Sequence, residues 1–102
     1  MTAEASLSFA GDCMQVAGEI NFTSVIALET EGAVWLQSQA PDKCRVNLGA
    51  VSYSNSAGAA LLISWQRTAA AVGKKLEIEQ VPQSLQGLLH LSGLDNVLPA
   101  LI

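Results

Sequence analysis

YSNSAGAALL, residues 53 to 62, places two serines and an asparagine directly before a run of small apolar residues. Serine and asparagine are favoured at helix N-caps, and alanine and leucine are favoured in helix interiors. The stretch therefore predicts that a helix begins at Ser56. Asn55 or Ser56 can simply cap this helix. Alternatively, the serine is presented to a partner or to a kinase, because a helix start carries unpaired N–H groups that stabilise a phosphoserine.

The sequence before this stretch predicts a hairpin and a first helix. Apolar and polar residues alternate through residues 5–10 and 12–18, and a Gly-Asp pair supplies turn chemistry between them. Thr23 or Ser24 then caps a helix that we expect to run to about Gln39.

Apolar residues at helical spacing indicate which faces form the core. On the first helix they are Leu28, Gly32, Trp35 and Leu36. A glycine inside a helix costs about 1 kcal/mol relative to alanine, so Gly32 suggests that a neighbouring element comes close. On the second helix, residues 56–72, the stripe comprises Leu62, Trp65, Ala69 and Val72. This position favours Trp65 as a core residue rather than an interface residue.

The remaining elements complete an alternating pattern. A short strand is expected at residues 43–48, a loop at 49–54, and another strand at 75–79. Gly73 should end the second helix, and Pro82 should open a third at its N1 position, with a core face of Leu85, Leu88 and Leu89. The order β-β-α-β-α-β-α predicts an α/β architecture with crossover connections, in a single domain over residues 1–102.

Composition argues against several classes of partner. The 102-residue chain has a net charge of −4 and scattered basic residues, which argues against nucleic acid and anionic membrane surfaces. The N-terminus lacks the features of a secretory signal, and the most apolar run, residues 57–63, is too short to span a bilayer. We therefore expect a cytoplasmic protein with no direct membrane insertion.

Little in the sequence points to catalysis. Cys13 and Cys44 lie far apart and His90 is remote, so we expect reduced thiols and no metal site. No nucleophile–base spacing or phosphate-binding loop is evident, and we expect neither enzymatic activity nor a cofactor. Glu77 and Glu79 alternate on one strand, which is typical of a solvated edge that discourages aggregation.

The order of the elements and the quoted stretch together resemble the STAS domain, a family named for sulfate transporters and anti-sigma-factor antagonists. In that family an Asp-Ser-Ser/Thr-Gly-Leu type motif opens the second helix, and NSAGA, residues 55–59, occupies this place. GEIN, residues 18–21, looks like the family's Gly-Glu-Leu-Asp after the second strand, and SGLDNVLP, residues 92–99, looks like its C-terminal Gly-Leu segment. The resemblance covers nearly the whole chain and implies a four-stranded mixed sheet with helices packed on it.

Within the family, the short length and the VLPAL ending resemble the stand-alone STAS subunit of the bacterial Mla phospholipid ABC transporter. This resemblance implies a non-enzymatic accessory protein on the cytoplasmic ATPase subunit and, through it, on the permease. It would support the assembly and activity of a transporter that maintains outer-membrane lipid asymmetry. The implied contact surface is the start of the second helix, with residues Ser54, Asn55, Ser56, Ala57, Gly58 and Ala59.

The alternative within the same family is an anti-sigma-factor antagonist that is switched by phosphorylation. Ser56 matches the phosphorylatable position, and the partner would be a serine kinase or anti-sigma factor. However, Asn47 and Asn55 stand where family members commonly have aspartate. A missing carboxylate beside Ser56 removes a charge that helps a kinase to recognise the site, whereas an asparagine still caps the helix and still supports binding.

Overall fold

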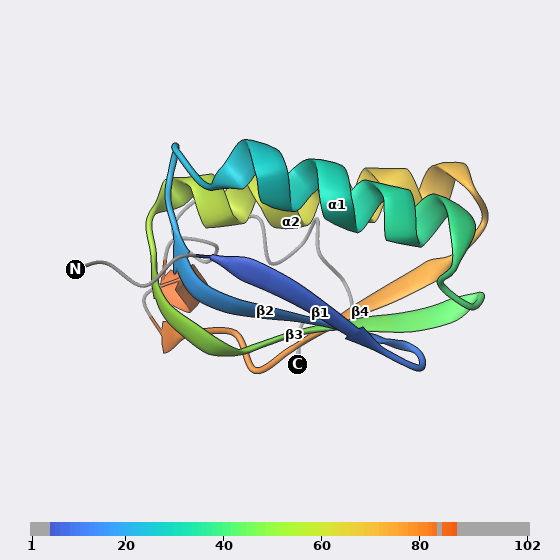
Figure 1. Ribbon diagram of the computed structural model, residues 1–102, viewed down its shortest axis with the longest axis horizontal. Helices are drawn as coiled ribbons and strands as arrows, with labels where there is room; N and C mark the ends of the chain where they lie inside the picture. The colour runs from blue at the N-terminus through green and yellow to red at the C-terminus, as the bar shows by residue number, and fades with distance from the viewer. Residues whose placement is uncertain (1–4, 84, 88–102) are drawn as a thin grey trace.

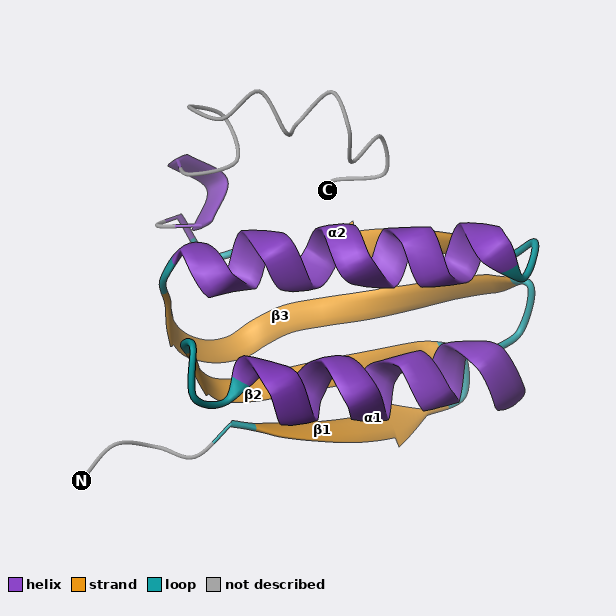
Figure 2. Cartoon of the chain, turned by 90° about the horizontal axis from the view of Figure 1, so that it is seen from above, coloured by secondary structure: helices purple, strands orange, loops and turns teal. Residues whose placement is uncertain are grey.

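The computed structural model describes residues 5–83 and 85–87 of the chain. Its elements in order are β1 (Ser6–Ala10), β2 (Cys13–Ile20), α1 (Val25–Ser38), β3 (Lys43–Ser54), α2 (Ser56–Ala71) and β4 (Lys75–Glu79). A further helix begins at Gln83. Both long helices lie on one face of the sheet and run side by side across it (Figures 1 and 2).

The sheet confirms the predicted mixed architecture. Its strand order is β1-β2-β3-β4, with β1 antiparallel to β2 and the other neighbouring strands parallel. The crossovers from β2 to β3 and from β3 to β4 both step in the same direction across the sheet. Because such connections are right-handed, both place their helix on the same face. The opposite face of the sheet carries no helix among the described residues.

The prediction for the third strand was too short. Residues 49–54 continue β3 to Ser54 instead of forming a loop. β2 pairs with β3 along this extension, with Gly18 opposite Val51 and Ile20 opposite Ser54, after register shifts that absorb the irregular segment. Strand pairing across the sheet thus overrides the local signal of glycine and serine.

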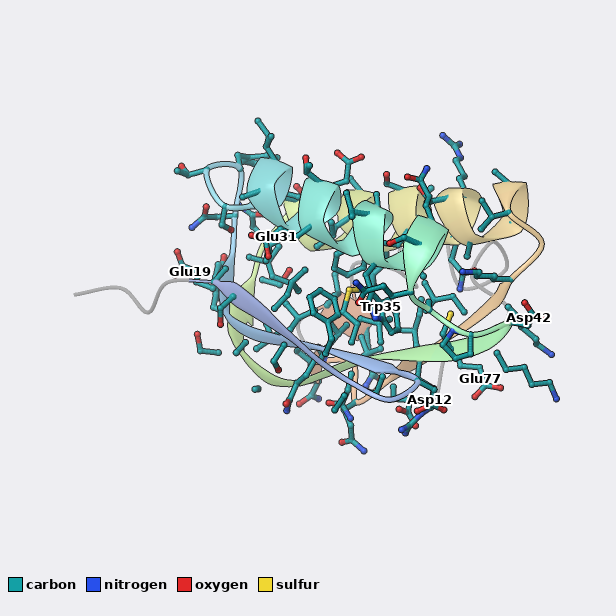
Figure 3. All side chains as sticks on the ribbon, turned by 45° about the vertical axis from the view of Figure 1, so that its right-hand side comes forward. Asp12, Glu19, Glu31, Trp35, Asp42 and Glu77 are labelled. Carbon is teal, nitrogen blue, oxygen red and sulfur yellow. The ribbon has the colours of Figure 1, made fainter. Side chains whose placement is uncertain are left out.

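The core lies between the helices and the sheet, and it confirms the predicted close approach at Gly32. Trp65 of α2 is fully buried, and its ring atoms lie 2.4 Å from the place where a Cβ on Gly32 would stand. The Trp65 indole N–H donates to the carbonyl oxygen of Glu29 at 3.3 Å. Trp35 of α1 fills the same layer (Figure 3). Val72 departs from its predicted stripe and is exposed, because it is the C-cap residue beyond the last turn.

On the face of the sheet opposite the helices, called here the open face, an arginine links three parts of the chain. Arg45 of β3 forms ion pairs with Asp12 in the hairpin turn and with Glu79 of β4, each at 3.0 Å. The hydrogen bond from Arg45 is the largest cause that lowers the pKa of Asp12. Glu79 is therefore not merely a solvated charge on an edge strand, as its alternation with Glu77 suggested, because it binds Arg45.

Two predictions concern the end of the described chain. Pro82 precedes the first helical residue, so it lies at the N-cap rather than at N1, and its carbonyl accepts from the backbone N–H of Leu85 and Gln86. Leu85 is buried, as predicted. Leu88, Leu89, His90 and the C-terminal Gly-Leu segment lie outside the described residues.

Candidate functional site

The start of α2 is built around Asn55. Its backbone is extended, and its side-chain Oδ1 accepts from the backbone N–H of Ala57 at 2.8 Å, which makes Asn55 the N-cap. The Asn55 N–H donates to the carbonyl oxygen of Ile20 at 3.1 Å, so the end of β2 holds the helix entry in place. Of the two caps that the sequence left open, the structure selects Asn55, and this frees the Ser56 side chain from the capping role.

The six predicted contact residues fall into two groups. Ser56 is exposed and Asn55 is partly exposed. The other four, which are buried within the chain, are Ser54, Ala57, Gly58 and Ala59. Small side chains at these four positions therefore serve contacts within the domain, and Ser56 with Asn55 is the part of the motif that a partner can touch directly.

Gly58 explains why small residues are needed here. A Cβ on Gly58 would stand 2.0 Å from the Ser54 Oγ, 3.3 Å from the Ser54 Cβ and 3.4 Å from a methyl carbon of Leu85. The Ser54 hydroxyl donates to the carbonyl oxygen of Asn55 at 3.0 Å. The first turn of α2 is thus pressed against the end of β3 on one side and against the following helix on the other.

The GEIN segment ends β2 and enters the neighbouring loop at the same end of the sheet. Asn21 Oδ1 accepts from the backbone N–H groups of Thr23 and Ser24, both at 2.9 Å, and Asn21 Nδ2 donates to the Glu19 carboxylate at 2.6 Å. The Ser24 hydroxyl donates to the Glu19 carbonyl at 3.0 Å. Ser24, one of the two predicted caps, is the N-cap residue of α1, but its side chain makes no capping hydrogen bond. The Asn21 side-chain oxygen binds the N–H groups of the two residues that precede the helix.

Exposed apolar side chains at this end were missed from the sequence. Phe22 and Ile26 are 68% and 70% exposed, and Tyr53 at the end of β3 is 52% exposed. Phe22 lies in the loop before α1, Ile26 lies in the first turn of α1, and Tyr53 lies in the strand that leads into α2. The starts of α1 and α2 lie at the same end of the sheet (Figure 2). A signal existed, since Ile26 lies off the apolar stripe of its helix. This end lies beyond the carboxyl ends of the parallel strands, where ligands bind in many open α/β sheets.

The start of α2 presents polar groups that can form hydrogen bonds with a ligand or a partner. Ser56 offers an exposed hydroxyl at a helix N-terminus, and the first turn of α2 contains no acidic residue. Within residues 5–83 and 85–87, no cluster of His, Cys, Asp and Glu is arranged to hold a metal ion. In that same part of the chain, no helix combines the length and the apolar character needed to cross a bilayer.

A family profile described as "Mlab, STAS domain" matches residues 4–101. The chain belongs to this family. The STAS fold and the MlaB-like character that its motifs resembled are thereby confirmed. No curated protein matches this STAS domain in sequence.

Solved structures agree on the fold of this STAS domain. The unphosphorylated form of the anti-sigma factor antagonist SpoIIAA superposes with a TM-score of 0.73 at 17% identity, covering 96% of this chain and 85% of that one. An anti-sigma factor antagonist from Mycobacterium paratuberculosis gives 0.71 at 24% identity, covering 98% and 85%. A STAS domain protein from Planctomyces limnophilus gives 0.68 at 14% identity, covering 95% and 87%. At these identities the likeness establishes the fold alone.

Proposed function

We propose that this STAS domain is a non-enzymatic accessory subunit that binds the cytoplasmic ATPase of an Mla-type phospholipid ABC transporter. Membership of the MlaB family supports this partner. Through the ATPase the domain associates with the permease at the inner membrane, and it supports assembly and activity of the transporter that maintains outer-membrane lipid asymmetry. In this proposal the domain itself stays in the cytoplasm and needs no cofactor.

The observation that carries the proposal is the surface around Ser56. It joins an exposed serine at the start of α2 to exposed apolar side chains at the same end, above all Phe22 and Ile26. Large exposed apolar side chains that gather at one place mark interaction sites, and aromatic residues often contribute most of the binding energy. Asn55 and Gly58 fix the backbone beneath this surface, so it is formed before a partner arrives.

Copurification with the ATPase tests this proposal. Ser56→Arg and Phe22→Ala should each reduce binding to the ATPase–permease complex by at least about tenfold, because both change exposed side chains at the proposed contact. Ser38→Arg is the matched control, since Ser38 is exposed in the last turn of α1, at the other end of the helix layer. Normal binding by both site variants, with all proteins folded, would exclude this surface.

A second candidate function is a phosphorylation-switched antagonist with a kinase or anti-sigma factor as its partner. One specific observation favours it: the Ser56 hydroxyl is exposed at a helix N-terminus without an acidic neighbour in the first turn, where a phosphate would be stabilised. Intact-mass measurement after incubation with host-cell extract and ATP distinguishes the two functions. Added phosphate on the wild type, but not on Ser56→Ala, supports the switch, and an unchanged mass argues against it.

A further inference from the structure

The two edges of the sheet differ in how they are protected. β4 carries Lys75, Glu77 and Glu79, and charges of this kind discourage pairing with another strand. β1, with the sequence SLSFA, carries no charged residue and no proline, and β2 is its one neighbouring strand within the described chain. An uncharged edge with regular pairing on its inner side is a template for a further strand.

The pairing of β2 with β3 shows which residues of β1 direct their backbone N–H and C=O groups toward the outer edge. The carbonyl oxygen of Asp12 accepts from the N–H of Arg45 on β3, so the next residue along β2, Cys13, directs its backbone groups toward β1. Ala10 is opposite Cys13 and Ser8 is opposite Gln15, and hydrogen-bonded pairs alternate along an antiparallel ladder. The N–H and C=O groups of Leu7 and Phe9 therefore point away from β2, toward the outer edge.

The side chains of β1 match a second copy of the same strand. If two β1 strands pair antiparallel with Ser8 opposite Ser8, each Leu7 lies opposite the other copy's Phe9, and their outward groups form a hydrogen-bonded pair. The Phe9 ring stacks on Trp35 with centroids 5.4 Å apart yet stays 43% exposed. Leu7 of the second copy would cover this exposed flank, and the absence of charge on β1 leaves no like-charge repulsion between the copies.

From these features we propose that the domain forms a symmetric dimer through β1, with the twofold axis at Ser8 and a continuous sheet across both copies. This proposal does not depend on the proposed function as a transporter subunit. The antiparallel arrangement points the two Ser56 ends in opposite directions, so both remain accessible to partners. A five-residue strand spans only about 17 Å, which is short for a stable interface, so the dimer should be weak and concentration-dependent.

Charged substitutions at Ser8, on the proposed twofold axis, test the dimer. Ser8 is exposed on the open face of the sheet, and the two copies of its Cβ would lie about 5 Å apart. Sedimentation equilibrium of the full chain from about 10 μM to 1 mM should show the 10.7 kDa monomer giving way to a dimer. Ser8→Lys alone and Ser8→Glu alone should each remain monomeric, whereas an equimolar mixture of the two should dimerise.

The matched control is Gln15→Lys. Gln15 is exposed opposite Ser8 on β2, one strand inside the edge, so its charge lies away from the axis and dimerisation should persist. Circular dichroism confirms that each variant is folded. A wild type that stays monomeric to 1 mM overturns the proposal. If Ser8→Lys still dimerises, or if the mixture of the two charged variants stays monomeric, the proposal that the twofold axis lies at Ser8 is wrong.

Discussion

Trp65 occupies the space that a side chain on Gly32 would need. The indole ring lies 2.4 Å from that Cβ position, and its N–H bonds the carbonyl of Glu29 one turn earlier on α1. The two helices thus pack through a tryptophan against a glycine notch. Gly32 lowers the helix propensity of α1, but it leaves the space in which the Trp65 ring packs. This contact sets the distance between the two helices.

Gly32→Ala should destabilise the domain despite the better helix propensity of alanine. Alanine gains about 1 kcal/mol in a helix, but a methyl group forced against the buried Trp65 ring costs about 1–3 kcal/mol or more. Urea unfolding followed by tryptophan fluorescence should give a lower midpoint with an unchanged m-value.

The matched control for this substitution is Gly87→Ala. Gly87 is also helical, and nothing among the described residues lies within 4 Å of its Cβ position. This variant should be neutral or up to about 1 kcal/mol more stable. Equal effects of the two substitutions would contradict the role that we assign to the notch.

The loss of stability caused by Gly58→Ala should depend on the side chain at residue 54. The alanine Cβ would meet the Ser54 Oγ at 2.0 Å, so we expect a loss of about 2 kcal/mol or more in unfolding free energy. Ser54→Ala removes that oxygen and leaves a Cβ at 3.3 Å, which is tight but tolerable after a small shift. The loss of unfolding free energy in the double variant should therefore be about 1 kcal/mol smaller than the sum of the losses in the two single variants. A double-mutant cycle measures this difference. Strict additivity would show that the contact is not limiting.

Asn55→Ala should weaken the start of α2 by about 1 kcal/mol, because the N–H of Ala57 loses the oxygen that caps it. Asn55→Asp should retain the stability, since a carboxylate accepts the same hydrogen bond and interacts favourably with the helix N-terminus. Thermal or urea unfolding at neutral pH measures both. A loss as large for aspartate as for alanine would argue against capping as the function of this side chain.

Acid should weaken the link between the hairpin and β3. Arg45 holds the pKa of Asp12 below its ordinary value in the folded protein. A lowered folded-state pKa contributes stability that is fully present above the unfolded pKa, about 3.9, and is lost as the pH falls through the folded value. Unfolding free energies measured between pH 7 and pH 3 should therefore fall less steeply for Asp12→Asn than for the wild type. Arg45→Gln should show the same shallower slope, and parallel slopes for all three proteins would contradict the assignment.

Local sequence determined most of the element pattern. The hairpin, both helices and β4 lie close to where alternation, helical spacing and Gly73 predicted them, because these signals act over a few residues. The core faces of Leu28, Trp35 and Leu62 also followed from spacing. The family motif could be recognised in the linear order of GEIN and NSAGA, and the family profile confirms it.

Tertiary structure decided what local signals could not. The chain beyond Leu48 is a strand because β2 pairs with it, although glycine and serine there suggest a loop. The open-face network joins residues from a turn, a central strand and an edge strand, and no spacing in the sequence brings Asp12, Arg45 and Glu79 together. In the candidate site, burial turned four of the six predicted contact residues inward and left Ser56 and Asn55 at the surface. Sequence specifies which residues can lie together, but only the packed chain fixes which of them face solvent.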